Sequence, residues 1–335
     1  MEGINLKLRL LKSKRVLKGI YQHEIAKEIG ISHKSYNFKE NGKVGFNVDE
    51  ILKVIECLDL TFDEVNDIFF FNKLLILYDL IILIDMKREF IVGGISFNMI
   101  KVDGGTFWMG AQDNDPDGLN YNEKADRFYT SPVHKVTLSD YYIAESMVTQ
   151  ELWEAVMGKN PSYYKGAKKP VNEVSWNDAQ EFIKKLNEIT GENFRLPTEA
   201  EWEFAAKGGT KSKGCIYAGS DDYNEVAWNN DNCREPQEVM TKLPNELGIY
   251  DMCGNLKEMC QDYYAEYPAE PQVNPQGPKK EDVNYEFNMT YFFRYYLHVL
   301  RSSSVLFSHL TSFIEDRSRI ADYHTDIDVG FRLAL

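Results

Sequence analysis

Cysteine and histidine are the residue types in this 335-residue chain that could ligate a metal ion or act as a nucleophile. The five cysteines are an odd number, include no Cys-x-x-Cys pair and show no metal-ligand spacing to the six histidines. They are Cys57, Cys215, Cys233, Cys253 and Cys260. The spacing therefore predicts no metal centre formed by cysteine and histidine, and the cysteine usage fits a reducing compartment.

Length and charge limit the classes to which this protein can belong. The chain is long enough for two domains, and its 43% hydrophobic residues can bury a sizeable core. The formal net charge of −14 argues against attraction of the whole chain to nucleic acid or anionic membrane, although a local basic patch could bind DNA. Residues 1–11 lack the apolar core and cleavage site of a secretory signal, so we expect a cytoplasmic protein.

Residues 295–328 have an unusual composition. Lys, Glu, Gln, Met and Trp make up 79 of the 335 residues, so about eight are expected in this run, yet only Glu315 occurs. The residue types that are present can all be written by a codon ending in a pyrimidine, and the five depleted types cannot. The alternative is an ordinary loop rich in serine and aromatic residues that happens to lack long polar side chains.

The first seventy residues are predicted to form five short helices, at 6–17, 21–29, 33–41, 49–58 and 62–70. Between the second and third, Gly30-Ile31-Ser32 predicts a tight turn in which Ser32 caps the following helix. Residues 1–45 carry a net charge of about +6 and residues 46–70 about −6. This basic front is compatible with phosphate contact.

Residues 21–42 resemble the helix-turn-helix of the phage-repressor (Cro and C1-like) family. The resemblance rests on small Ala26 where two helices cross, on Gly30 at the turn and on Glu40-Asn41-Gly42 as a closing signature. It implies that the third helix enters the major groove of DNA. The implied contacts are His33, Lys34, Ser35 and Asn37. The alternative is that the fold survives only as a dimerisation or docking module.

Residues 68–84 are the most hydrophobic part of the chain. The run is shorter than a bilayer span and is interrupted by Asn72, Lys73 and Asp79, so we expect a buried segment joining two domains rather than a membrane helix. Gly93-Gly94 is interpreted as a boundary. The predicted domains are a helix-turn-helix domain at 1–70, an apolar linker at 71–98 and a larger domain at 99–335.

The larger domain shows short strands and a few capped helices. Residues 99–110 alternate as in a hairpin, with Gly104-Gly105 at its turn. Two amphipathic helices are predicted at 149–157 and 176–189, the second capped by Ser175, and a third follows Thr198, with Glu201 at the capping-box position. Mixed elements of this kind indicate an α+β domain.

Five blocks of this domain resemble the formylglycine-generating-enzyme (sulfatase-modifying factor) superfamily, in that family's order. They lie at 102–110, 170–179, 195–204, 248–255 and 330–333, and together they span about 240 residues. The resemblance implies a C-type-lectin-like fold with a small twisted sheet and two main helices. The predicted fold class is thus α+β, a C-type-lectin-like domain preceded by a small all-α helix-turn-helix domain.

The oxidase chemistry of that superfamily does not carry over. Its copper-dependent members need two cysteine thiols after a Gly-Gly-Ser motif, and here Phe307 and Thr311 lie about where the pair would fall. An iron-dependent branch needs a histidine cluster, and the histidines after residue 99 show no ligand spacing. We therefore predict no enzyme and no required cofactor, and a metal-dependent oxidase is the weaker alternative.

Residues 251–258 resemble a calcium loop of the family. The resemblance implies a structural calcium ion bound by the Asp251 and Glu258 carboxylates and by the Gly254 and Leu256 carbonyls. The family usually has an aromatic pair where this chain has Lys257 and Met259. The alternative is a pair of carboxylates that caps backbone amides.

The superfamily also includes the variable proteins of diversity-generating retroelements, in which codons containing template adenines become randomised and end in a pyrimidine. Residues 295–328, followed by the block Gly330-Phe331-Arg332-Leu333, resemble such a tail. The resemblance implies a diversified recognition surface on a rigid frame. Its candidate contacts are Tyr295, Tyr296, His298, Val305, Leu306, Phe307, His309, Leu310, Thr311, Phe313, Ile314, Asp316, Asp322, Tyr323, His324 and Asp326.

The predicted function is non-enzymatic recognition of a macromolecular partner, because scattered side chains on a shallow face do not enclose a small molecule. Val305, Phe307, Phe313 and Ile314 could instead be core residues, and we expect this of one or two of them. The main alternative function is a DNA-binding transcriptional regulator with a fixed C-terminal sensing domain. A homo-oligomer would suit such a regulator, since repressor-like units read paired half-sites.

Overall fold

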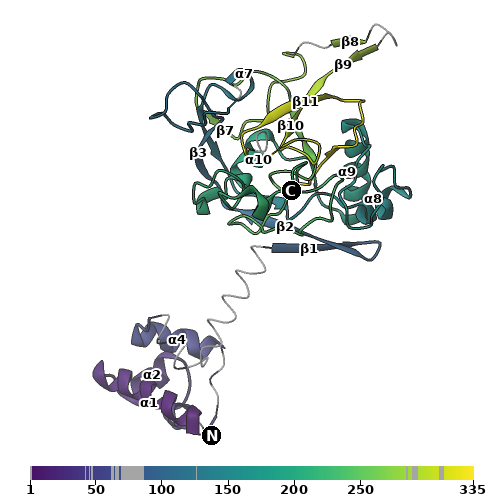
Figure 1. Cartoon of the computed structure of the whole chain (residues 1–335). Coiled ribbons are helices and arrows are strands. Elements are labelled where there is room, and N and C mark those ends of the chain that lie inside the picture. The colour runs from purple at the N-terminus through teal and green to yellow at the C-terminus, as the bar shows by residue number, and fades with distance from the viewer. Residues whose placement is uncertain are drawn as a thin grey trace. The chain divides into compact units, whose positions relative to one another are not determined.

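The computed structural model describes residues 2–41, 43–44, 46, 48–61, 64, 68, 87–125, 127–283, 286–288, 293–308 and 313–335. The chain divides into two compact units, Met1–Asp85 and Met86–Leu335, of which the first is helical and the second mixed (Figure 1). Most of the apolar run at 68–84 lies outside the described residues. Within the described ranges, no helix is both long and apolar enough to cross a membrane.

The first unit contains α1 (Glu2–Leu17), α2 (Gln22–Glu28), α3 (His33–Glu40) and α4 (Val48–Leu58). The turn between α2 and α3 is the predicted one, with Gly30 at φ +77° and the Ser32 hydroxyl accepting the Ser35 N–H at 3.1 Å. The helices share a core that includes buried Leu11, Tyr36 and Val54. The helix predicted at 62–70 lies largely outside the described residues.

The strands of the second unit form four sheets among the described residues. One sheet has the order β1-β2-β5, formed by β1 (Lys87–Val92), β2 (Ile95–Val102) and β5 (Tyr141–Ala144), and another has the order β3-β4-β7, formed by β3 (Gly105–Met109), β4 (His134–Leu138) and β7 (Gln272–Val273). The third has the order β11-β10-β6-β12, formed by β6 (Lys257–Tyr263), β10 (Leu297–Arg301), β11 (Arg317–Ala321) and β12 (Val329–Gly330). A small pair joins β8 (Glu286–Asn288) to β9 (Phe293–Tyr295).

The hairpin predicted at 99–110 is wrong. β2 pairs with β1 and β5, while β3 pairs with β4 in a different sheet, so the chain leaves one sheet at Gly104. The true hairpin turn is Gly93-Gly94, with φ of +58° and +83°, which the sequence had suggested as a domain boundary. Gly93-Gly94 and Gly104-Gly105 both fit the sequence pattern of a hairpin turn. Only the pairing of β2 with β5, which are far apart in the sequence, shows which of them forms the hairpin. As a result, β1 and the start of β2 lie within residues 71–98, the range assigned from sequence to a linker.

The three predicted helices of the second unit are confirmed. They are α8 (Gln150–Met157), α9 (Trp176–Thr190) and α10 (Glu199–Ala206), with Thr149, Ser175 and Thr198 as side-chain caps and Glu201 completing a capping box. Shorter pieces are α7 (Arg127–Thr130), the 3-10 helix η2 (Gly209–Lys211) and α11 (Tyr223–Val226). α8 and α9 lie side by side (Figure 1).

The C-terminal block 330–333 runs through the core. Phe331 is completely buried and meets both Trp153 of α8 and Phe182 of α9 edge-on. Its carbonyl accepts the Val148 N–H at 2.9 Å, and the Leu333 carbonyl accepts the Ala144 N–H at 2.8 Å. The last residues of the chain therefore fix β5 and the α8–α9 pair to the sheet that contains β12.

Candidate ligand-binding surface

The tail is built around two antiparallel strands. β10 pairs with β11 from Leu297↔Ala321 to Arg301↔Arg317, and its other edge pairs with β6. The chain between the strands, residues 302–316, is an excursion that leaves the sheet at Arg301 and returns at Arg317. The two arginines are thus direct cross-strand neighbours at the base of the excursion.

Buried ion pairs hold this base to α10. The Arg301 guanidinium donates to Glu199 and Glu203, each at 2.9 Å, and the Arg317 guanidinium donates to both carboxylate oxygens of Glu199 at 2.7 and 2.8 Å. All four residues are buried, and the Tyr267 hydroxyl donates to Glu199 at 2.8 Å. Both ends of the excursion therefore bind one carboxylate in the first turn of α10.

Lys207 extends the same network into the excursion. Its ammonium group lies 2.9 Å from Glu203 and 3.1 Å from Glu315, and it also donates to the Trp108 carbonyl at 3.2 Å. Burial raises the pKa of Glu203, but Lys207 and Arg301 outweigh burial and lower that pKa to about 2. Glu203 is therefore ionised at neutral pH, and the network connects the excursion to β3.

Several predicted contact residues are accessible. Leu306, Phe307 and Tyr323 are 43%, 40% and 38% exposed, and His324 is also exposed. The other predicted polar contacts and two tyrosines are half-buried, namely Tyr295, Tyr296, Asp316, Asp322 and Asp326. His309, Leu310 and Thr311 lie outside the described residues.

Four predicted contacts are core residues instead. Val305, Phe313 and Ile314 are buried and Phe307 is exposed, so three of these four residues are in the core rather than the expected one or two. His298 is buried because its alternating position on β10 faces α9, where its ring stacks on Trp176 with centroids 3.9 Å apart. The apolar pattern of the tail could not separate core from surface because the excursion has no regular period.

Accessible and half-buried aromatic residues of the tail meet one another and basic side chains outside the tail. The Tyr295 and Tyr323 rings meet edge-on at 5.4 Å, and Lys280 lies 4.5 Å from the centroid of Tyr296. Lys257 lies 4.0 Å from the centroid of Phe307. Tyrosine, with its large apolar face and polar tip, is a frequent contact residue in protein interfaces.

The serine triplet after Arg301 replaces the glycines that the family resemblance leads one to expect. Ser302 has φ +70°, a conformation that is costly for a residue with a Cβ. Its buried hydroxyl accepts the Gly254 N–H at 2.9 Å, and the Ser304 hydroxyl donates to Asp328 at 2.8 Å. The triplet therefore keeps the glycine-like backbone and adds hydrogen bonds to neighbouring loops.

The two carboxylates proposed to bind calcium make contacts within the protein. Both oxygens of Glu258 accept from Arg332, at 2.5 and 2.7 Å, and one also accepts from Trp202. Asp251 accepts the Met240 N–H at 2.9 Å, and burial raises the pKa of this carboxyl to about 6. Gly254 and Leu256 lie in the buried chain between the two carboxylates. The other oxygen of Asp251 is buried and accepts no hydrogen bond among the described residues, so a calcium ion at this loop stays a prediction.

The residues implied in DNA contact lie on α3. His33 and Lys34 are exposed, and Ser35 and Asn37 are half-buried. Gln22 of α2 accepts from the Asn37 side chain at 3.1 Å, and its oxygen lies 3.3 Å from the His33 ring nitrogen. The Lys34 ammonium lies 5.8 Å from the centroid of the Phe38 ring, one turn further along α3.

Sequence reasoning missed a cavity beside the excursion. Its volume is about 710 Å³, and Phe313 and Glu315 of the tail line it together with Trp108 of β3 and Tyr121. The sequence contains no signal for it, because the residues that line it come from segments that are far apart in the chain. What could not be foreseen was that the tail closes against them.

Comparisons with known proteins place this geometry in a family. Residues 96–335 match the model of the sulfatase-modifying factor enzyme 1-like domain, and residues 6–73 match a protein family of unknown function, DUF739. The chain belongs to the sulfatase-modifying factor enzyme 1-like family. The structure also matches variable protein 1 of Treponema denticola, with a TM-score of 0.60 and 29% identity, covering 74% of this chain and 98% of that one. The predicted resemblance to retroelement variable proteins with a C-type-lectin-like fold is confirmed.

The characterised proteins to which this chain is similar carry different names. The chain is 32% identical over 231 residues to the chaperone protein LppX of Paenibacillus barcinonensis, covering 53% of this chain and 75% of the relative. It is 29% identical over 206 residues to the formylglycine-generating enzyme of Bos taurus, covering 52% of this chain and 54% of that enzyme. PvdO from Pseudomonas aeruginosa, at 22% identity and a TM-score of 0.55, shares the fold.

Replacing His298 should change the acid sensitivity of the second unit. Burial lowers the pKa of this imidazole from 6.5 to about 4, so between these values the unfolded chain binds a proton that the folded chain does not. Acidification from pH 6.5 to 4 should therefore cost the wild type about 3 kcal/mol more than His298→Phe, which keeps the stacking on Trp176. Urea unfolding followed by tryptophan fluorescence reports this unit alone, since all five tryptophans lie in it.

Burial raises the pKa of Asp262 to about 8, so this residue makes stability depend on pH in the opposite direction. Wild type and His298→Phe share this contribution, and it cancels when the two are compared. His324→Phe, at an exposed histidine, is the control for loss of an imidazole. Parallel pH profiles for wild type and His298→Phe would contradict the prediction.

The strain at Ser302 can be measured by comparing two substitutions. Ser302→Ala and Ser302→Gly both remove the acceptor for the Gly254 N–H, but only glycine relaxes the positive φ. The free energy of unfolding of Ser302→Gly should exceed that of Ser302→Ala by about 1 kcal/mol. Equal unfolding free energies in urea would show that the backbone at this position carries no strain.

Proposed function

We propose that the second unit is a non-enzymatic recognition module whose tail, residues 295–328, is diversified by a retroelement and binds a macromolecular partner. The observation that supports this proposal is the way in which the tail is attached to the rest of the domain. Accessible side chains such as Leu306, Phe307 and Tyr323 project from segments whose ends are fixed by buried Arg301 and Arg317. A frame of this kind tolerates changes of the exposed side chains without loss of the fold.

The state of the cysteines supports a function without oxidase chemistry. Phe307 and Thr311 stand where the oxidase resemblance requires thiols. Burial raises the pKa of every cysteine, to about 12 for Cys253, so none is a ready thiolate at neutral pH. All five are unpaired, which is typical of a reducing compartment, and we place the protein in the cytoplasm.

Sequencing the DNA around the gene tests the proposal. We expect a near-copy of the stretch encoding residues 295–335 that differs only where the copy has adenine, beside a reverse transcriptase gene. Among isolates, substitutions should concentrate at exposed Leu306, Phe307, Tyr323 and His324, and should spare Glu199 on α10. The proposal would be contradicted if no such copy exists, or if the substitutions among isolates are spread evenly over the domain.

A second candidate function is operator binding by the first unit, alone or as a homo-oligomer. It is favoured by the turn between α2 and α3, by exposed Lys34 and by the charge of about +6 on residues 1–45. In this alternative the second unit senses one fixed partner. The same gene neighbourhood would then show no template copy.

Replacing Lys34 should separate the two functions. If α3 contacts phosphates, Lys34→Ala should weaken binding to the DNA upstream of the gene and lower the slope of log affinity against log salt by about 1. Lys211→Ala, an exposed lysine in the second unit, is the matched control and should leave both quantities unchanged. Fluorescence anisotropy at several salt concentrations measures them, and no effect of Lys34→Ala would argue for a docking role of the first unit.

A further inference from the structure

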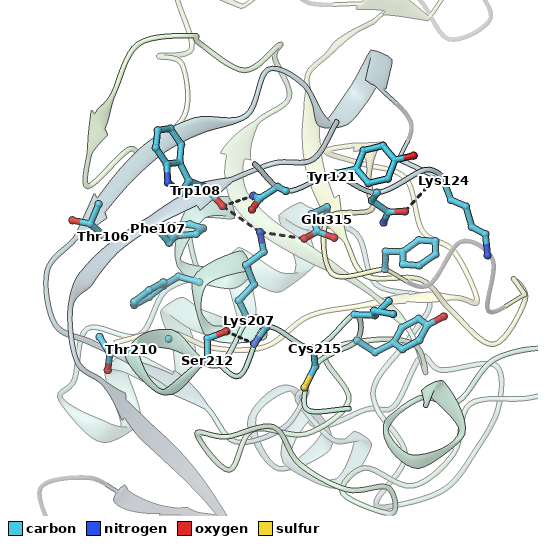
Figure 2. Close-up of a pocket in the computed structure, with 18 of the residues that line it drawn as sticks. Thr106, Phe107, Trp108, Tyr121, Lys124, Lys207, Thr210, Ser212, Cys215 and Glu315 are labelled. Carbon is cyan, nitrogen blue, oxygen red and sulfur yellow. Dashed lines mark hydrogen bonds and ion pairs between the residues drawn. The ribbon is translucent and has the colours of Figure 1, made fainter. Parts of the chain in front are cut away.

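The cavity beside the excursion is formed by both fixed and tail residues. Fixed walls come from β3, from residues 120–124 and from the chain between Phe204 and Tyr217, and the tail contributes Phe313 and Glu315. Figure 2 shows Phe107 and Trp108 on one side and Tyr121 and Lys124 on the other, with Lys207 and Glu315 between them. A volume of about 710 Å³ is within the range of pockets that bind ligands.

Six of the nineteen residues that line the cavity are aromatic. Phe107 and Phe204 meet at 5.1 Å, and on the opposite wall Phe313 stacks on Tyr217 at 5.7 Å with nearly parallel planes. Trp108 and Tyr121 are 41% and 40% exposed although they are large apolar side chains. Such walls favour a flat aromatic ligand, which gains from both buried area and ring contacts.

The charges argue for a neutral ligand. Residues 86–335 contain 26 basic and 39 acidic residues, a net charge of −13 that repels anions. The formal charges of the side chains that line the cavity sum to zero, since two are basic and two acidic: Lys124, Lys207, Glu123 and Glu315. The protein's own Lys207 and Lys124 lie 6.0 and 5.9 Å from the centroids of Phe107 and Phe313, the places that a cationic ligand would take.

Glu315 offers a polar group to the ligand. All three ammonium hydrogens of Lys207 have partners in Glu203, Glu315 and the Trp108 carbonyl. Half-buried Glu315 uses one oxygen for Lys207, and among the described residues its second oxygen accepts no hydrogen bond. A ring that carries an N–H or O–H donor would satisfy this acceptor, which distinguishes indole and phenol from a plain phenyl ring.

We infer that this cavity binds a tryptophan or tyrosine side chain displayed by a protein partner. The open rim at Trp108 and Tyr121 suits a ligand that continues outside the cavity, whereas a small molecule is usually enclosed. Buried tryptophan and tyrosine side chains carry much of the energy of protein interfaces. The inference rests on the proposed function and adds to the diversified surface a neighbouring site, to which the tail contributes buried Phe313 and half-buried Glu315.

Titration of the full chain with N-acetyltryptophanamide, followed by saturation-transfer NMR, tests the inference. We expect a dissociation constant of about 0.1 to 1 mM, and about fivefold weaker binding of N-acetylphenylalaninamide, which lacks the ring donor. Trp108→Ala and Tyr121→Ala should each weaken binding about tenfold. Both residues are partly exposed, and Tyr163→Ala, at an exposed tyrosine outside the cavity, is the matched control and should bind like wild type.

Absence of binding at about 10 mM, or binding that survives both cavity substitutions, would overturn the inference. Equal binding of the phenylalanine amide would overturn the role of Glu315. Free indole that binds as tightly as the capped amino acid would point to a small-molecule ligand and overturn the protein partner. If a template copy is found but the tryptophan amide does not bind, the proposed function stands and the inference about the cavity fails. If the amide binds but no template copy exists, the cavity site stands and the proposed diversification fails.

Discussion

The second unit depends on one carboxylate, that of Glu199, which binds two buried arginines from different strands. Arg301 ends β10 and Arg317 begins β11, so the carboxylate fixes the separation of the strands and the base of the excursion between them. Glu199 can take this place because Thr198 caps α10 and sets the direction of its first turn. The local capping signal and the long-range ion pairs thus support the same geometry.

A buried ion network of this kind contributes more to specificity than to net stability. Removing water from the charges costs several kcal/mol for each ion, and their mutual attraction only offsets this cost when the hydrogen bonds are complete. Here Glu199 and Glu203 accept from arginine, lysine and tyrosine donors, which meets that condition for the carboxylates, whereas the buried Nε of Arg301 has no partner among the described residues. An alternative register of β10 and β11 would leave charges unpaired in the interior, so the network selects one register.

The elements set by local signals could be predicted from sequence. The helices at 150–157, 176–190 and 199–206 and their caps follow from hydrogen bonds within four residues. The strand pairing could not be predicted in the same way, because Gly93-Gly94 and Gly104-Gly105 are equivalent turn signals until β5 is placed beside β2. For the site, composition identified the tail, but burial of His298 and Phe313 depends on Trp176 and Tyr217, which are distant in sequence. The cavity escaped prediction for the same reason.

The burial of Val305, Phe313 and Ile314 limits what a diversified tail can encode. A polar or charged residue at any of the three would have to be desolvated inside a packed domain, at a cost comparable with the whole stability of many domains. Many of the sequences that random codons can write there would therefore never accumulate as folded protein. The repertoire available for selection is smaller than the number of coding combinations, and the core itself acts as the first filter on the library, before any partner is encountered.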